Sequence, residues 1–285
     1  MKDELAQIQN TEHGIFGGYV HQRIKKNKNF MCCITGPTGS GKTYSALSFA
    51  QKWDKNFTSN NIVFTPQEFI DLLNSNTLKK GSVIIADEFG VSMNSRNWQS
   101  VSNQVINYVL QTFRSKNYIV LFTSPDFSFI DTAARKLFHC HMMTAGINHT
   151  EKHCLIKPYM LQINQRTGDI YYKYLRLSLK NTGEKKLSEI EVGLPTKKLI
   201  KEYEIKKDAF VTNLNLEIEA KLRDKQVDKG EKKDLVQNEM NIKANAIDKL
   251  RGEGKSWREL ATLFNFNTDD AIRVWFSRNR TNNEP

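Results

Sequence analysis

The octet of residues 36–43 has the types and spacing needed to bind phosphate groups. It consists of Gly36, Pro37, Thr38, Gly39, Ser40, Gly41, Lys42 and Thr43, and it fits the pattern G-x-x-x-x-G-K-[ST]. In such a loop the glycines let backbone N–H groups turn toward the phosphates, the lysine reaches the β- and γ-phosphates, and the last hydroxyl ligates Mg²⁺. The octet therefore predicts a site for a nucleoside triphosphate and Mg²⁺.

Two acidic residues, Asp87 and Glu88, directly follow the apolar run of residues 83–86. At the carboxyl end of a buried parallel strand they would lie at the sheet edge where a nucleotide sits. Asp87 is then placed to hold Mg²⁺ through its water shell, and Glu88 to polarise the attacking water. This pairing favours hydrolysis over phosphoryl transfer to a metabolite. The sequence contains no Asn/Thr-Lys-x-Asp motif, which would read guanine, so ATP is favoured over GTP.

Polar residues also end the next apolar run, 118–123. Thr123 and Ser124 stand directly before Pro125. Two interpretations are open: their hydroxyls lie beside the γ-phosphate and sense it, or they cap the turn at the proline. Thr123 is included among the candidate catalytic residues, with Lys42 and Glu88.

Three arginines follow the acidic pair in the chain: Arg96, Arg114 and Arg135. Any of them could act as a finger that neutralises transition-state charge at a neighbouring subunit's nucleotide, and each is also explained as a solvated surface residue. Arg135 is the preferred candidate because it follows the last strand end on the nucleotide side.

These residues can meet only if a sheet brings their strand ends to one edge. Continuous apolar runs predict strands at 30–35, 61–65, 82–86 and 118–123, and the segments between them predict helices at 42–53, 66–74 and 99–115. Strands of this kind are buried on both faces, as in a mostly parallel sheet covered by helices. We therefore expect an α/β three-layer sandwich, completed by a helix and a strand between 130 and 145.

Together, the loop, the acidic pair and the polar strand end resemble the additional-strand, catalytic-glutamate class of P-loop ATPases. Within that class, three short stretches are similar to HerA/FtsK-like and Zot-like ATPases of archaea, viruses and mobile elements: residues 87–90, 96–98 and 130–131. The resemblance covers about residues 30–145.

The resemblance implies ATP hydrolysis with Mg²⁺ in a homo-oligomer, which in this class can be a ring. One position departs from the pattern. HerA/FtsK-like proteins usually carry a glutamine at the strand end where this chain has Thr123 and Ser124. An AAA+-like arrangement therefore stays open.

The rest of the chain divides into smaller parts. Two extended runs between 155 and 179 flank the turn-forming cluster 164–169 and predict a β-hairpin. The expected division is an N-terminal extension (1–29), a P-loop ATPase domain (30–150), a β-hairpin with a charged helical linker (151–237) and a helix-turn-helix domain (238–285).

The C-terminal stretch 241–280 predicts three short helices. A capping box at Ser256 to Glu259 opens the second and Thr268 caps the third. Their expected core consists of Leu260, Ala261, Leu263, Phe264, Ile272, Val274, Trp275 and Phe276. Three arginines on the third helix, Arg273, Arg278 and Arg280, could contact phosphates or base edges. The stretch resembles helix-turn-helix DNA-binding domains, and the alternative is a bundle that binds protein or is purely structural.

Six histidines and cysteines fall within residues 139–154: His139, Cys140, His141, His149, His153 and Cys154. Their spacing matches no standard zinc finger, although His139 and His141 would share one face of a strand over 137–143. Packing or surface positions are favoured over a metal site.

The composition favours a nucleic-acid partner. The net charge of +11 attracts polyanions, and duplex DNA is the expected ligand. The four cysteines lack the density of a disulfide scaffold, and no apolar run approaches the ~18 residues of a membrane span.

The expected protein is a cytoplasmic ATPase acting on duplex DNA as a motor or remodelling enzyme. The alternative is an ATP-switched replication initiator or transposition regulator that does not translocate.

Overall fold

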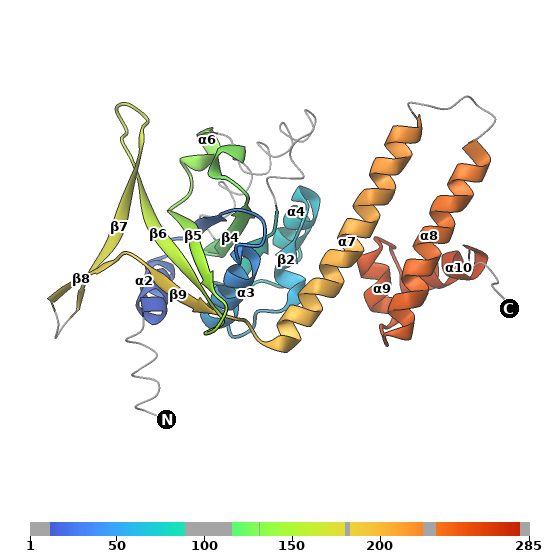
Figure 1. The fold of residues 1–285 in the computed structure, drawn as a ribbon, viewed down its shortest axis with the longest axis horizontal. Helices are drawn as coiled ribbons and strands as arrows, with labels where there is room; N and C mark the ends of the chain where they lie inside the picture. The colour runs from blue at the N-terminus through green and yellow to red at the C-terminus, as the bar shows by residue number, and fades with distance from the viewer. Residues whose placement is uncertain (1–11, 89–115, 131, 180–182, 225–231, 280–285) are drawn as a thin grey trace. The chain divides into compact units, whose positions relative to one another are not determined.

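The computed structural model describes residues 12–88, 116–130, 132–179, 183–224 and 232–279. The predicted helix at 99–115 lies outside these residues. So do the candidate arginines Arg96, Arg114 and Arg280. The chain forms two compact units, Met1–Ile200 and Lys201–Pro285 (Figure 1). Among the described residues, no helix combines the length and the apolar character needed to cross a membrane.

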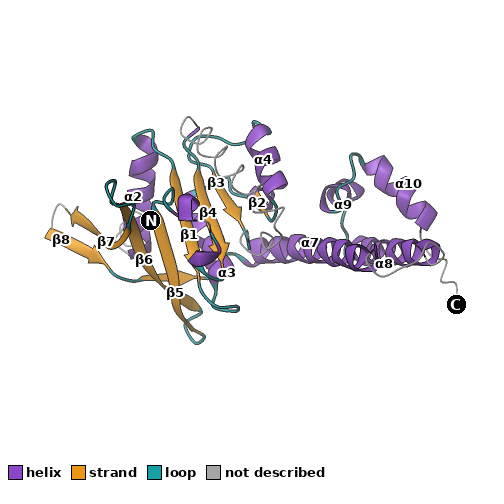
Figure 2. Ribbon diagram, turned by 90° about the horizontal axis from the view of Figure 1, so that it is seen from above, coloured by secondary structure: helices purple, strands orange, loops and turns teal. Residues whose placement is uncertain are grey.

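The first unit is built on a sheet with helices on both faces (Figure 2). Five parallel strands form its centre: β1 (Phe30–Thr35), β2 (Ile62–Val63), β3 (Val83–Ala86), β4 (Ile119–Ser124) and β5 (Cys140–Asn148). Their order across the sheet is β2-β3-β4-β1-β5. The predicted α/β fold with a mostly parallel sheet is confirmed. Because β4 lies between β1 and β3, the ends of these three strands are neighbours.

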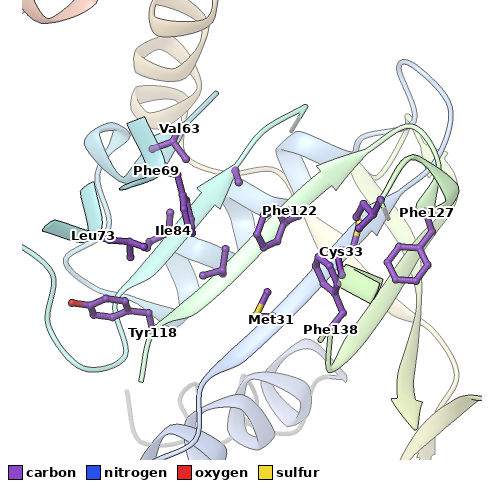
Figure 3. Packing of buried hydrophobic residues seen from close by; sticks show 14 residues of the cluster. Met31, Cys33, Val63, Phe69, Leu73, Ile84, Tyr118, Phe122, Phe127 and Phe138 are labelled. Atoms are coloured by element: carbon purple, nitrogen blue, oxygen red, sulfur yellow. The ribbon is translucent and has the colours of Figure 1, made fainter. Parts of the chain in front are cut away.

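Alternate residues of β1 face two different apolar layers. On one face, the ring of Phe30 contacts Phe16 of α2 (Glu12–Lys25) and Trp53 of α3 (Lys42–Trp53), with ring centroids 6.1 and 6.2 Å away. On the other face, Met31 and Cys33 belong to a cluster with Phe69 of α4 (Pro66–Asn74) (Figure 3). Helices therefore cover both faces of the central strands, as their continuous apolar sequences predict.

Helix α4 follows its predicted bounds because its first turn is closed by side chains. Thr65 accepts a hydrogen bond from the Glu68 backbone N–H at 3.1 Å, and the Glu68 carboxylate accepts from the Phe64 N–H at 2.7 Å. Pro66 suits the first helical position because its missing N–H would have no partner there. Shorter elements connect the strands: η1 (Ser59–Asn61), η2 (Phe127–Phe129) and α6 (Thr132–Arg135).

An antiparallel extension continues the sheet beyond β5. It consists of β6 (His153–Ile163), β7 (Ile170–Leu179) and β8 (Gly183–Leu187), with β9 (Ile190–Gly193) paired to the start of β6. The predicted hairpin is β6 and β7. Its turn needs Gly168, which has a φ of 77° and donates its N–H to the Asn164 carbonyl at 2.8 Å.

The second unit is helical. Helix α7 (Lys197–Asp224) leads into it, followed by α8 (Lys232–Gly252), α9 (Trp257–Leu263) and α10 (Asp269–Asn279). The capping box at Ser256 and Glu259 is present, and Thr268 accepts from the Ala271 N–H at 3.1 Å. These caps confirm the predicted starts of α9 and α10.

Two details of this unit correct the sequence-based expectation. The first helix is not short: α8 has 21 residues and begins at Lys232, because the sequence from Lys232 to Asn241 contains no glycine or proline. Val274 is not a core residue, since it is 49% exposed, whereas Ile272 and Phe276 are buried. At 3.6 residues per turn, positions 272 and 276 share a face of α10 that position 274 does not.

Candidate active site

The phosphate-binding loop joins the end of β1 to the start of α3. Three of its glycines have positive φ: 153° at Gly36, 76° at Gly39 and 86° at Gly41. Side chains rarely accept these angles, and a Cβ atom at Gly36 would also overlap the Thr144 hydroxyl. Around Gly39, by contrast, a Cβ would meet nothing within 4 Å. The loop therefore has the backbone that a phosphate cradle requires.

Lys42 stands at the start of α3, where the pattern places it. Its Nζ donates to the Pro37 carbonyl oxygen of the same loop at 2.8 Å. The ammonium group thus lies over the loop, on the side where the β- and γ-phosphates of a bound nucleotide are expected.

Three predicted residues meet at one carboxylate oxygen. Thr43 Oγ1 donates to Asp87 Oδ1 at 2.9 Å, and Thr123 Oγ1 donates to the same atom at 2.6 Å. Asp87 is fully buried, so these two hydrogen bonds stabilise a charge that burial alone would disfavour. Hydroxyl and carboxylate oxygens are ligands that Mg²⁺ prefers, and Thr43 and Asp87 are the residues that would hold it here.

Glu88 has an unusual backbone conformation for a residue with a side chain, with a φ of 50°. Its N–H donates to Thr123 Oγ1 at 2.8 Å. The Thr123 hydroxyl therefore donates one hydrogen bond, to the Asp87 carboxylate, and accepts another, from the Glu88 N–H. Ser124 does something different: its Oγ donates to the Asp126 carbonyl at 2.8 Å and closes the turn after Pro125. The turn-closing interpretation therefore applies to Ser124. Thr123 instead lies beside the acidic residues, and its contact with a γ-phosphate stays a prediction.

The described contacts of Arg135 are with Thr132 and Phe127, not with the residues around Asp87. It donates to Thr132 Oγ1 at 2.9 Å, and its guanidinium lies 6.0 Å from the centroid of the Phe127 ring. Its Nε is buried with no hydrogen-bond partner. A finger acts on the nucleotide of another subunit, so these contacts within one chain leave that role a prediction.

Thr144 supports the loop from β5, and nothing in its sequence context pointed to it. Its hydroxyl forms hydrogen bonds with Ser40 Oγ at 2.8 Å and with the Thr35 carbonyl at 3.2 Å. An irregularity in the pairing of β5 with β6, between Thr144 and Gly146, accompanies this contact. Cys154 on β6 adds a second support by donating its thiol to the Ser40 carbonyl at 3.4 Å.

A small cavity flanks the loop on the side of β5, away from Asp87. Its volume is about 150 Å³. The loop and α3 contribute Gly41, Tyr44 and Ser45 to its wall, and the remaining lining residues are Ile147, His149, Lys152, His153, Cys154, Val192, Gly193 and Leu194. The cavity is smaller than the ~300–1,000 Å³ typical of whole drug-sized ligands, and suits a single ring system.

The histidines near β5 are packed into the protein. His141 Nε2 is 2.7 Å from Thr35 Oγ1, and its ring stacks on Phe127 at 4.3 Å; burial lowers its pKa to about 4. His139 lies before the first residue of β5 and stacks on Phe30, so the two histidines do not share a strand face. Burial lowers the pKa of His139 to about 3, and its Nδ1 accepts from the Met31 N–H. No group of three or more possible metal ligands occurs among the described residues.

Comparison with known proteins identifies the family. The family model of Novel STAND NTPase 3, or nSTAND3, matches residues 20–177, more than half of the chain. The chain belongs to the nSTAND3 family. It is therefore a nucleotide-binding P-loop NTPase, as the loop and its surroundings indicate, and such proteins usually use Mg²⁺.

Two further comparisons add little to the nSTAND3 assignment. The N-terminal domain of zonular occludens toxin from Neisseria meningitidis is 17% identical, with a TM-score of 0.33, over 52% of this chain and 94% of that one. A search of curated protein sequences gives no match.

Replacing Thr144 with valine should weaken nucleotide binding. The change keeps the size of the side chain but removes the hydrogen bonds to Ser40 and to the Thr35 carbonyl, each worth ~0.5–1.5 kcal/mol. We expect Thr144→Val to raise the Kd for a fluorescent ATP analogue roughly 3- to 10-fold in a titration with Mg²⁺ present. Thr150→Val, in the exposed turn between β5 and β6, is the matched control. Equal affinities of the two variants would contradict the support role of Thr144.

The buried histidines should make the protein less stable in acid. A histidine whose pKa falls on folding stabilises the fold above its unfolded pKa, and this contribution is lost as the pH falls toward the folded value. For His141 that window runs from 6.5 down to about 4. Chemical denaturation across this range should show a falling free energy of unfolding, with a shallower fall in His141→Gln. His149→Gln should follow the unmodified chain, and identical slopes for all three would argue against the buried neutral ring.

Proposed function

We propose that this nSTAND3 chain is an ATPase that acts on duplex DNA as a motor or remodelling enzyme. The observation that carries the hydrolytic part is the meeting of Thr43 and Thr123 on the buried Asp87 carboxylate, with Glu88 held next to it. An acidic residue beside the magnesium ligands and the phosphate loop is what activation of water requires.

Each residue of the site has a distinct part in this proposal. The loop of residues 36–43 cradles the phosphates, Lys42 neutralises the β- and γ-oxygens, and Thr43 and Asp87 hold Mg²⁺, which offsets the developing negative charge. Glu88 accepts a proton from the attacking water. Thr123 fixes the position of both acidic residues through its hydroxyl.

The strand order supports the finer assignment to the additional-strand, catalytic-glutamate class. In this sheet β4 is inserted between the loop strand β1 and the acidic strand β3. The acidic pair follows β3 directly, and the polar residue Thr123 occupies the β4 strand end beside it. Arg135 is the proposed finger because it follows the last strand end on the nucleotide side. A homo-oligomer, which in this class can be a ring, is proposed from the resemblance to this class.

The cavity beside β5 is the proposed site of the adenine base. In this proposal the triphosphate runs along the loop, from the Asp87 side toward the first turn of α3. Tyr44 and Ser45 of that turn line the cavity, together with Ile147, His149 and His153. These apolar and aromatic groups suit a flat purine ring.

The DNA-binding part of the proposal rests on α9 and α10. The two helices are separated by the short segment 264–268 and pack on one apolar core, as in a helix-turn-helix. Arg273 and Arg278 on α10 are exposed, and the exposed Val274 between them could contact a thymine methyl group. The alternative function is an ATP-switched initiator or transposition regulator, and displacement of a protein roadblock on DNA, powered by ATP, would exclude it.

Replacing Glu88 with glutamine should separate binding from hydrolysis. The amide keeps the shape of the side chain but accepts protons poorly, and loss of a general base costs about 10²- to 10⁴-fold in rate. We expect Glu88→Gln to bind the ATP analogue normally while ATP hydrolysis, with or without duplex DNA, falls at least about 100-fold. The exposed Glu191→Gln on β9 serves as the control. Unchanged hydrolysis in the Glu88 variant would remove this residue from the mechanism.

Neutralising the exposed arginines of α10 should weaken duplex binding. Each specific base contact contributes ~1–3 kcal/mol, so Arg273→Gln with Arg278→Gln should lower duplex affinity at least about 10-fold in anisotropy measurements. ATP hydrolysis without DNA should stay unchanged, because neither residue belongs to the nucleotide site. Lys249→Gln on α8 is the control for net charge. Undiminished duplex binding in the double variant would favour a protein-binding or structural bundle.

A further inference from the structure

A row of aromatic rings crosses the sheet from the phosphate-loop side to β8. In order, it contains Phe127, His141, Tyr172, Tyr159 and Tyr174. Successive ring centroids are 4.3, 5.8, 6.1 and 5.1 Å apart. Lys186 ends the row, with its Nζ 4.3 Å from the centroid of Tyr174.

The strand register places this row on one face of the sheet. His141 is opposite Cys33 and Tyr159, and Tyr159 is opposite Tyr174. Residues directly opposite one another in neighbouring strands share a face. Cys33 belongs to the core under α4, so the tyrosines continue that face beyond the core. There the face is open: Tyr172 is 49% exposed.

Positive charge accompanies the rings. Arg176 and Lys186 are opposite one another on the same face as Tyr174, and both are exposed. The segment 153–187 holds seven lysines and arginines but only two acidic residues, Asp169 and Glu184. Lys157 is also on this face, and its Nζ lies 3.8 Å from Glu189 Oε1. Both side chains are well exposed, so this ion pair is weak.

We propose that this face of β6, β7 and β8 binds single-stranded DNA. The exposed Tyr172, beside the half-buried Tyr159 and Tyr174, offers a platform on which bases stack whatever their sequence, and flanking basic groups can follow the phosphates. Duplex DNA cannot use such a surface in the same way, because its base faces are already stacked on one another. The preference for DNA over RNA rests on the proposed function, in which α10 binds duplex DNA. The site is separate from α10 and does not depend on ATP hydrolysis.

The hairpin supplies a matched pair of tyrosines for the test. Tyr171 and Tyr172 are adjacent in β7 and equally exposed, at 48% and 49%, but neighbouring strand residues point to opposite faces. With the full chain and a labelled oligothymidylate of about 20 nucleotides, Tyr172→Ala should weaken binding at least about 5-fold. Tyr171→Ala should bind like the unmodified chain, and Tyr172→Phe, which keeps the ring, should retain most of the affinity. Equal effects of the two alanine variants would overturn the proposal.

The basic residues give a second, independent pair. Lys186 is on the tyrosine face and Lys185 on the opposite one. Lys186→Gln should lower the affinity for the oligothymidylate and reduce its salt dependence by about one counterion, whereas Lys185→Gln should do so less. Equal losses of affinity in the two lysine variants would contradict binding at the tyrosine face. Circular dichroism shows whether Tyr172→Ala keeps its fold. If it does not, ultraviolet crosslinking of oligothymidylate to the unmodified chain decides: crosslinks at Tyr159, Tyr172, Tyr174, Arg176 or Lys186 support the proposal, and crosslinks confined to other residues, such as Tyr171 on the opposite face, overturn it.

Competition separates this surface from other nucleic-acid sites. An unlabelled single strand should displace the oligothymidylate, and a duplex of the same length should do so poorly. Arg273→Gln with Arg278→Gln should leave single-strand binding unchanged even if it abolishes duplex binding, so failure of either site is recognised separately. Tighter binding of oligouridylate than of oligothymidylate would overturn the choice of DNA.

Discussion

The buried carboxylate of Asp87 is the constraint around which the site is organised. An ionised group in a protein interior is costly unless hydrogen bonds replace its water, and here the donors are Thr43 at the start of α3 and Thr123 at the end of β4. Both hydroxyls reach the same oxygen only if β4 lies beside β3 and the loop returns to that edge of the sheet. The strand order and the loop conformation are therefore both required by one buried charge.

Residues whose role is local could be predicted from the sequence. The phosphate loop, the capping box at Ser256 and Glu259 and the turn at Gly168 each depend on a few consecutive residues, and each has the predicted geometry. Thr144 could not be predicted, because its contact with Ser40 depends on the register of β5 against β1 and on a local irregularity in β5. Val274 was misplaced for a related reason: which face of α10 is buried depends on the direction from which α8 and α9 pack.

The positive φ of Glu88 is a local backbone conformation that depends on a contact distant in the sequence. Nothing in the segment around it favours a left-handed conformation, which costs an ordinary residue about 1–3 kcal/mol. The hydrogen bond from its N–H to Thr123, from a strand that follows much later in the chain, compensates part of that cost. The acidic residue proposed to activate water is thus positioned by β4, and a change at Thr123 would remove the acceptor that holds its N–H.

The two flanks of the phosphate loop differ in chemistry. Toward β4 the loop faces hydroxyls and carboxylates, whereas toward β5 it faces Thr144, Cys154 and a small cavity. His141 joins these parts, since its Nε2 lies 2.7 Å from the hydroxyl of Thr35, the residue before the loop, and its ring touches Tyr172. Burial keeps this imidazole neutral, and its Nδ1 has no hydrogen-bond partner. The contacts of Nε2 with Thr35 and of the ring with Phe127 and Tyr172 therefore hold the imidazole between the start of the loop and the tyrosines of the hairpin.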